Sequence, residues 1–236
     1  VTGASLGLGA ALAAGLARDG WSLVIDGRHA ADLHHQATRL RAALTGPGAT
    51  VADVVGDVAD PAHRQVLAAA VRAHGHVDLV LNNASVLGPS PQPALVDYPL
   101  DALRAVYEVN TFAPLALLQD LTPWLRVSGE PRVVNITSDA AVEAYPQWGG
   151  YGSSKAALEQ LTATWAAEQP WCRAWAVDPG DLRTRLHQQA FPGEDISDRP
   201  EPESVVPALL SLLASGRPSG RVRLADIAVS FPAGIR

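Results

Sequence analysis

The chain has 236 residues, of which 47% are hydrophobic and 18% are charged, and its formal net charge is −6. This length suits one α/β domain, and the composition provides enough apolar side chains for a full core. The negative net charge argues against nucleic acid or an anionic membrane surface as the main partner.

The cysteine count and the hydropathy indicate the compartment and the kinds of site to expect. Cys172 is the only cysteine, so the chain offers neither an internal disulfide nor a cysteine-based metal site. A reducing cytoplasm is therefore the expected location. No apolar run is long enough to span a bilayer, and we expect neither a membrane-embedded segment nor a bound metal.

A glycine-rich stretch opens the chain. Gly3, Gly7 and Gly9 follow the pattern Gly-x-x-x-Gly-x-Gly, and residues 10–18, rich in Ala and Leu, predict a helix directly after them. Such a turn presents backbone N–H groups at the positive end of a helix, which is a cradle for a pyrophosphate. A glycine-rich turn without any ligand is the alternative. Because the sequence contains no methionine and Val1 already borders the motif, we expect an apolar strand to precede Val1.

The rest of the chain alternates short apolar strands with helices. This pattern is typical of a parallel sheet covered on both faces, so we predict a Rossmann-like, doubly wound α/β fold in a single domain over residues 1–236. Strands are expected at residues 21–25, 51–55, 77–81, 132–136, 173–177 and 222–224. Helices are expected at residues 30–44, 61–73, 100–125, 151–168 and 204–214, the third of them broken or kinked by Pro114 and Pro123.

The segment Tyr151-Gly152-Ser153-Ser154-Lys155 holds the only lysine of the chain, whereas the remaining residues counted as Lys+Arg are arginine. Residues i and i+4 share a helix face, so a phenol and an ammonium placed here can act on one small region. A nearby positive charge favours phenolate and lowers the tyrosine pKa, which suits Tyr151 to general acid/base work. Taken alone, the motif also fits an ordinary surface helix.

Further polar and glycine motifs lie where the expected strands end or along the long central helix. In order, they are Thr2-Gly3, Asp57-Val58, Asn82-Asn83-Ala84-Ser85, Asn110, Ser138, Pro179-Gly180 and Thr184. Ser138 precedes Tyr151 by 13 residues. The ordered set resembles the short-chain dehydrogenase/reductase family, in its single-domain branch, over nearly the whole chain.

This resemblance implies hydride transfer between a nicotinamide cofactor and an alcohol or carbonyl compound. Tyr151 would be the general acid/base, and Lys155 would lower its pKa and hold the nicotinamide ribose. Ser138 would donate a hydrogen bond to the developing alkoxide, and Asn110 would hold a water that links Lys155 to solvent.

The resemblance also implies a set of cofactor contacts and shows two departures from the family pattern. Ser85 stands where the family has glycine, so we expect a shifted backbone or a narrowed pocket there, and Asp178 replaces the usual asparagine. The implied cofactor contacts are Gly3, Ser5, Leu6, Gly7, Leu8, Gly9, Arg28, Asp57, Val58, Asn83, Ala84, Ser85, Tyr151, Lys155, Pro179, Gly180, Leu182 and Thr184.

The residues after the first visible strand bear on the choice of cofactor. Asp26 lies 23 residues after Gly3, near the spacing of an acid that binds the ribose 2′-hydroxyl of NAD(H). The NAD-selecting acid of the family would fall at Gly27, however, and in an extended strand the Asp26 side chain points to the opposite face. Gly27 leaves room for a phosphate, and Arg28 offers it a guanidinium. We therefore favour NADP(H), with NAD(H) as the alternative.

The favoured function is that of an NAD(P)-dependent oxidoreductase acting on a small-molecule alcohol or carbonyl substrate. A catalytically silent nucleotide-binding regulator on the same fold is the second possibility, and the intact set of Ser138, Tyr151 and Lys155 argues against it. A scaffolding subunit is the third, and it would not need the glycine loop.

Two regions outside the motifs carry expectations. The long polar stretch 181–202 predicts a mobile lid, with Leu182, Leu186 and Phe191 as its apolar underside. By resemblance, the helices predicted at residues 100–125 and 151–168 form the interface of a homodimer or homotetramer. The apolar residues that support this interface are Leu117, Leu118, Leu161 and Trp165.

The remaining aromatic and basic rings have simpler interpretations. Trp148 is a candidate for a residue that faces the substrate. His34, His35 and His187 are interpreted as loop and surface histidines, with no metal site among them.

Overall fold

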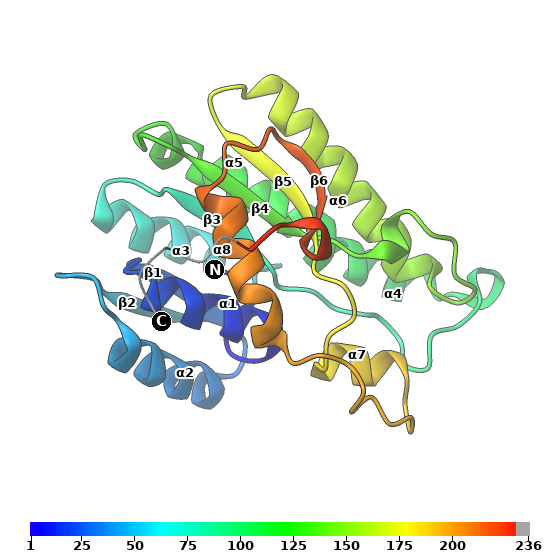
Figure 1. Ribbon diagram of the computed structural model, residues 1–236. Helices are drawn as coiled ribbons and strands as arrows, with labels where there is room; N and C mark the ends of the chain where they lie inside the picture. The colour runs from blue at the N-terminus through cyan, green and yellow to red at the C-terminus, as the bar shows by residue number, and fades with distance from the viewer. Residues whose placement is uncertain (230–236) are drawn as a thin grey trace.

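Parallel strands form the centre of the molecule. The computed structural model describes residues 1–229 (Figure 1). The strands pair in two runs, β1 (Leu23–Gly27) with β2 (Val51–Val55), and then β3 (Leu79–Asn82), β4 (Arg132–Ile136), β5 (Arg173–Asp178) and β6 (Gly220–Arg223) in that order. Every one of these pairings is parallel, so the carboxyl ends of the strands meet at one edge of the sheet.

The first residues of the chain join the two runs of strands. The Val1 amino group donates to the Val24 carbonyl at 2.8 Å, and the Asp26 N–H donates to the Val1 carbonyl at 3.3 Å. On the other side, the Thr2 N–H donates to the Leu81 carbonyl at 3.0 Å. This segment therefore lies between β1 and β3 and delivers the glycine-rich loop to the carboxyl edge of the sheet.

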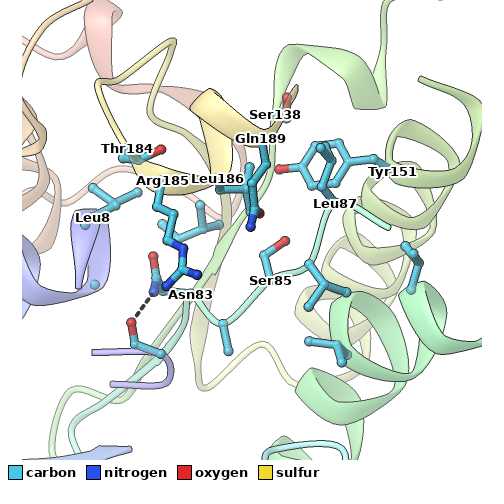
Figure 2. Close-up of a pocket in the computed structure, with 18 of the residues that line it drawn as sticks. Leu8, Asn83, Ser85, Leu87, Ser138, Tyr151, Thr184, Arg185, Leu186 and Gln189 are labelled. Atoms are coloured by element: carbon cyan, nitrogen blue, oxygen red, sulfur yellow. Dashed lines mark hydrogen bonds between the residues drawn. The ribbon is translucent and has the colours of Figure 1, made fainter. Parts of the chain in front are cut away.

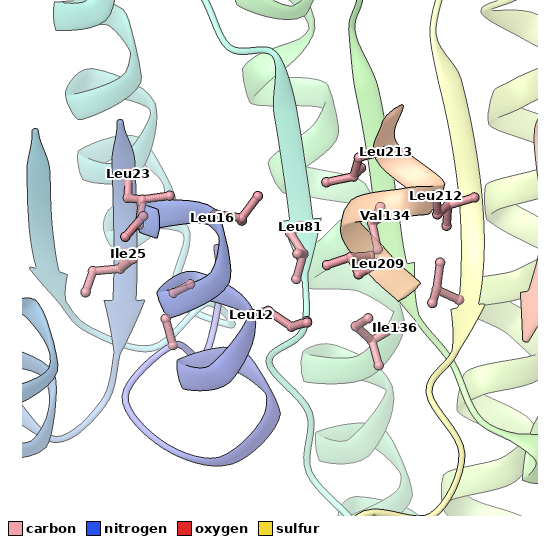
Figure 3. Close-up of a cluster of buried hydrophobic side chains, with 14 of the residues drawn as sticks. Leu12, Leu16, Leu23, Ile25, Leu81, Val134, Ile136, Leu209, Leu212 and Leu213 are labelled. Atoms are coloured by element: carbon pink, nitrogen blue, oxygen red, sulfur yellow. The ribbon is translucent and has the colours of Figure 1, made fainter. Parts of the chain in front are cut away.

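One face of the sheet is covered by α1 (Gly7–Arg18), α2 (Ala30–Ala43) and α8 (Val206–Ala214). Alternate strand residues point to this face, as the two-residue period of a strand requires. Full burial of one such aliphatic side chain contributes roughly 1.5–3 kcal/mol. Figure 3 shows part of this core, which includes Leu12, Leu16, Leu23, Ile25, Leu81, Val134, Ile136, Leu209 and Leu212.

The opposite face is covered by α3 (Pro61–His74), α5 (Ala113–Leu125) and α6 (Gly149–Glu168). Val133 belongs to this second core while its neighbour Val134 belongs to the first, which places β4 between two apolar layers. The predicted doubly wound sheet with helices on both faces is thus confirmed. The second core includes Leu67, Val71, Val80, Leu117, Leu118, Leu121, Leu125, Val133, Trp165 and Ala174.

The long helix predicted ahead of β4 is divided differently from the prediction. α4 (Leu100–Tyr107) and α5 are joined by a π-helical turn, η2 (Glu108–Phe112). Pro114 follows directly on this π turn as the second residue of α5, and Pro123 lies inside that helix without ending it. The irregularity comes from the π turn, a feature that often occurs at functional sites.

Short helical elements complete the described chain. The predicted loop 181–202 is not wholly irregular, because it contains α7 (Arg185–Ala190). The remaining turns are η1 (Leu95–Asp97), η3 (Asp139–Ala141), η4 (Pro202–Val205) and η5 (Leu224–Asp226).

The apolar residues that supported an oligomer interface have another role. Leu117, Leu118 and Trp165 are buried in the second core of a single copy, and Leu161 is half-buried. The first three side chains are therefore not available to an interface. Among the large apolar side chains of the same region, Leu100 and Phe112 are the exposed ones, at 64% and 50%.

Candidate active site

A cleft of ≈ 1000 Å³ opens along the carboxyl edge of the sheet, where open α/β sheets bind ligands. The glycine loop, the segments that follow β1 to β5, the start of α6 and α7 all line it. Of the predicted site residues, all but Asn110 line this cleft (Figure 2). Residues far apart in the sequence are therefore brought to one place by strand ends.

The glycine loop has the shape of a cradle for a diphosphate. Gly3 and Gly7 have φ values of 62° and 56°, in the left-handed region that favours glycine. A Cβ on Gly9 would lie 2.3 Å from the Gly3 carbonyl oxygen, so no side chain fits there. α1 begins at Gly7 without a side-chain hydrogen bond at its cap residue Leu6, which leaves helix N–H groups to bind an anion. The residues present thus fit the diphosphate of a dinucleotide.

Asn83 and Thr2 hold this loop against the end of β3. The Asn83 amide nitrogen donates to the carbonyl oxygens of Thr2 at 3.0 Å and Gly3 at 3.1 Å. The Thr2 hydroxyl accepts from the Asn83 and Ala84 N–H groups at 3.0 and 3.1 Å. These bonds fix the loop before any ligand arrives, so binding orders few further groups.

Asp26 is engaged within the protein. Its side chain is 1% exposed, accepts from the Gly3 N–H at 2.6 Å and lies 3.1 Å from His63 Nε2. The Asp26 side chain thus points toward α3, on the face opposite α1 and α2, as its strand register predicts. Arg28 is exposed beyond it, and Gly27 lies against Ser5, whose hydroxyl oxygen would be 3.0 Å from a Cβ at Gly27.

Tyr151 and Lys155 lie in the first two turns of α6, and both are buried. Lys155 is 1% exposed, donates from Nζ to the Ile136 carbonyl at 2.8 Å and lies 5.7 Å from the centroid of the Tyr151 ring. Burial lowers the pKa of Lys155 to about 7. Burial also raises the pKa of Tyr151 to about 12, against the opposing contacts with Ser85 and Ser138.

The predicted lowering of the tyrosine pKa by the lysine charge is not what this arrangement produces. The ammonium is itself disfavoured, because its surroundings exclude water. The groups that lower the pKa of Tyr151 are hydroxyls instead, first Ser85 and then Ser138, while Asp139 and Asp178 raise it. Burial therefore shifts the protonation equilibria of both groups toward their neutral forms, the phenol of Tyr151 and the amine of Lys155.

Asn110 lies behind the cleft rather than in its wall, in the π-helical turn η2. It is 0% exposed, and its amide nitrogen donates to the Val86 carbonyl at 2.9 Å and to the Ser154 hydroxyl at 3.0 Å. Its oxygen accepts from the Val86 N–H at 2.9 Å and from the Ser85 hydroxyl at 3.2 Å. All of its hydrogen-bonding capacity thus serves to tie the segment after β3 to α6.

Ser138 follows β4 and shares the end of the cleft with Tyr151. Its hydroxyl donates to the Asp139 carboxylate at 2.9 Å and accepts from the Ala140 N–H at 3.2 Å. In Figure 2 the Tyr151 hydroxyl lies between the hydroxyls of Ser138 and Ser85. A substrate oxygen placed there would meet several hydroxyl groups at once.

An apolar wall at this end of the cleft was largely missed by sequence analysis. Leu87 and Ala140 pack with Tyr151, and the Trp148 and Tyr151 ring centroids lie 5.9 Å apart at an interplanar angle of 74°. Trp148, which the sequence suggested as a residue facing the substrate, also packs against Phe191, with ring centroids 5.9 Å apart. Leu87 follows the predicted end of the strand at residues 77–81 by six residues, and that position is the one signal that pointed to it.

The segment 181–202 contributes residues from the other side. Leu182 is buried, and Leu186, Arg185 and Gln189 of α7 project into the cleft (Figure 2). His187, expected to be a surface histidine, is instead buried, lines the cleft and contacts Phe191 with ring centroids 4.9 Å apart. α7 turns its side chain inward, which the irregular stretch predicted from sequence did not reveal.

Two further properties concern the described part of the chain. Within residues 1–229, no helix is long and apolar enough to cross a membrane. In the same range, no cluster of three or more His, Cys, Asp or Glu residues is arranged to hold a metal ion.

The chain matches the profile of the short chain dehydrogenase family over residues 1–195. The chain belongs to the short-chain dehydrogenase family. It is 35% identical over 187 residues to 1-deoxy-11-beta-hydroxypentalenate dehydrogenase of Streptomyces arenae, a match that covers 78% of this chain and 61% of the relative. The chain spans less than two thirds of the length of this and several other curated relatives.

Solved structures of the same family superpose closely on the chain. A short chain dehydrogenase from Pseudomonas syringae has a TM-score of 0.87 and 30% sequence identity, covering 95% of this chain and 92% of its own. A short chain dehydrogenase from Shigella flexneri, complexed with NADP, has a TM-score of 0.86 and 29% identity, covering 94% of both chains. The expected family and fold are thus confirmed.

The second departure from the short-chain dehydrogenase pattern has a defined structural role. The Asp178 carboxylate accepts from the Gly180 N–H at 3.0 Å and from Arg221 at 2.9 Å. Arg221 also donates to Glu159 at 3.0 Å and to the Ser138 carbonyl at 3.3 Å. An ion network therefore connects the Pro179-Gly180 turn, the Ser138 segment and α6 beneath the site.

Proposed function

We propose that this chain is an NADP(H)-dependent oxidoreductase that transfers a hydride between the cofactor and an alcohol/carbonyl substrate. The observation that carries the proposal is the grouping of the Tyr151, Ser138 and Ser85 hydroxyls at the apolar end of a dinucleotide-shaped cleft, above buried Lys155. A regulator that only binds a nucleotide has no use for a transferable proton at that place. The names of the curated relatives, dehydrogenases and oxidoreductases, support the same reaction class.

Each residue of the grouping has a role in this reaction. The nicotinamide, when bound, supplies or accepts the hydride at the carbonyl carbon. Tyr151 gives its phenolic proton to the carbonyl oxygen during reduction and takes it back during oxidation. Ser138 donates a hydrogen bond to the alkoxide that develops, and Lys155 holds the ribose next to the phenol. The wall of Leu87 and Trp148 excludes water and orients the apolar part of the substrate.

A turnover assay separates this proposal from the silent regulator. Purified protein is mixed with NADPH and a panel of aldehydes and ketones, or with NADP⁺ and alcohols, and the absorbance of the reduced nicotinamide is followed. Loss of NADPH with an added carbonyl compound, or its formation from NADP⁺ with an added alcohol, supports the oxidoreductase. Tight cofactor binding by calorimetry without turnover on any compound supports the regulator.

Arg28 is proposed to read the 2′-phosphate of NADP(H). It is exposed beyond β1, next to His29 in the wall of the cleft, while Asp26 is turned inward toward His63. The Shigella flexneri structure that is complexed with NADP supports the same choice. A charge-assisted contact between guanidinium and phosphate is among the stronger polar contacts.

Arg28→Ala should therefore weaken NADPH binding about tenfold or more and leave NADH binding nearly unchanged, because the contact involves only the phosphate. Calorimetric titration of both cofactors into the wild type and the variant measures this. Arg39→Ala, which removes an exposed arginine of α2 outside the cleft, is the matched control. Equal affinities for the two cofactors in the wild type would contradict the assignment.

The domain, assembly and location of the protein remain proposals. We propose one dinucleotide-binding domain over residues 1–236, in a cytoplasmic homodimer or homotetramer without nucleic-acid or membrane partners. Exposed Leu100 and Phe112 support an interface on α4 and η2. The mass in solution across a dilution series would test this interface, and a monomer at all concentrations would reject it.

The lid role of residues 181–202 likewise stays a prediction, to be checked by hydrogen exchange with and without cofactor.

A further inference from the structure

Ser85 departs from the family pattern in the active-site segment, and it places a hydroxyl where the resemblance to the family led us to expect glycine. It follows β3, lines the cleft and donates from Oγ to the Asn110 carboxamide oxygen at 3.2 Å. In Figure 2 its hydroxyl points toward that of Tyr151, on the side opposite Ser138. A glycine here would leave the lower side of the phenol without a partner.

We propose that Ser85 is a positioning residue that follows the protonation state of Tyr151, donating to Asn110 while the phenol is intact and to the phenolate once the proton has left. This proposal rests on the proposed function, in which Tyr151 exchanges a proton with the substrate oxygen. No bond to carbon forms or breaks at Ser85. Its hydroxyl only rotates between two acceptors.

The surroundings of Asn110 make this rotation inexpensive. The carboxamide oxygen also accepts from the Val86 N–H at 2.9 Å, and the amide nitrogen donates to the Val86 carbonyl at 2.9 Å. When Ser85 turns away, the oxygen therefore keeps a partner and no buried acceptor is left unsatisfied. The paired bonds to Val86 also hold the backbone next to Ser85 in place, so that its hydroxyl stays within reach of the phenol.

The other charged and titratable groups near the Tyr151 phenol lie on the elements that pack around it. Lys155 lies beneath the ring on α6, Asp139 follows β4, Asp178 ends β5, and His187 of α7 is separated from the phenol by Phe191 and Trp148. Burial raises the pKa of Tyr151 most, the Ser85 contact is the largest opposing influence, and the two carboxylates raise the pKa further. The Ser138 contact is the smaller of the two opposing influences, and its hydroxyl donates to the Asp139 carboxylate at 2.9 Å.

The test measures the ionisation of Tyr151 without turnover. Fluorotyrosine is incorporated to bring the phenol pKa into an accessible range, the Tyr151 signal is assigned by its loss in Tyr151→Phe, and its fluorine NMR shift is titrated. Ser85→Gly should raise the midpoint by about one pH unit, because a hydrogen bond to a charged group is lost. Ser85→Thr, which keeps the hydroxyl, should stay near the wild-type midpoint. Ser153→Ala, which removes an exposed hydroxyl of α6, is the control.

An unchanged midpoint in Ser85→Gly would overturn the proposal. If circular dichroism shows that Ser85→Gly does not fold, Ser85→Ala is titrated in its place. Where turnover is found, the pH profiles give a second readout. The rise of oxidation with pH and the fall of reduction with pH should both move upward in Ser85→Gly, since both follow the same phenol. A merely structural residue would lower the rates without moving the profiles. If no compound is turned over, the proposed function fails while the NMR midpoint still decides the role of Ser85.

Discussion

Tyr151→Phe is expected to reduce turnover by about a hundredfold or more while leaving cofactor affinity almost unchanged. The substitution removes only the phenolic oxygen, and the ring keeps its packing against Trp148 and Leu87. The hydride still has a path, but the substrate oxygen loses its proton partner. Steady-state kinetics and calorimetric titration of NADPH, on the same preparations, measure the two effects separately.

Tyr145 provides a matched control for this substitution. It is a second phenol near the site, 44% exposed, and its hydroxyl donates to the Asp139 carboxylate at 2.9 Å. That hydrogen bond raises the pKa of Tyr145 and directs its proton to Asp139, and Tyr145 does not line the cleft. Tyr145→Phe should therefore retain most of the activity. Comparable losses in the two variants would show that Tyr151 has no special part in proton transfer.

The parts of the site that sequence analysis predicted well are those that depend on backbone shape and on strand ends. Gly3 and Gly7 must be glycine because of their positive φ values, and such positions leave a readable pattern. Strand ends are equally readable, since apolar runs such as residues 132–136 stop at polar residues that the parallel sheet gathers at one edge. Strand register alone predicted that the Asp26 side chain points to the face opposite the position of the NAD-selecting acid.

The parts that could not be predicted depend on tertiary packing. His187 and Leu87 have no motif, and their positions in the cleft arise from how α7 and the segment after β3 fold back over it. Leu117 and Trp165 appeared available for an interface, but a second core that no local pattern reveals buries them. The sequence pairs Tyr151 with Lys155, yet burial, which is a property of the whole fold, shifts both of them toward their neutral forms.

Lys155 is the residue for which function and stability should separate most clearly. Its folded pKa of about 7 lies below its ordinary value of 10.5 because it is buried. Between these pH values the unfolded chain binds a proton that the folded chain does not, so the free energy of unfolding should rise with pH across that window. Below about pH 7 both states are protonated, and the full cost of the buried charge, on the order of a few kcal/mol, is present.

Two substitutions at Lys155 should then abolish turnover and yet shift stability in opposite directions. Lys155→Met removes the ionisable group from a 1% exposed site, so the cofactor-free protein should be more stable near pH 7 and lose the rise of stability between about pH 7 and 10.5. Lys155→Arg places a larger cation there that cannot shed its proton, so it should be less stable than the wild type at every pH in that range. Denaturant unfolding at a series of pH values measures both, and Tyr151→Phe, which alters ionisation only near and above pH 10, serves as the control for the lower part of this window. Near-normal turnover in Lys155→Arg would mean that the Lys155 amine takes no part in the reaction. Equal pH dependence of stability in the wild type and Lys155→Met would mean that Lys155 is not a buried amine with a lowered pKa.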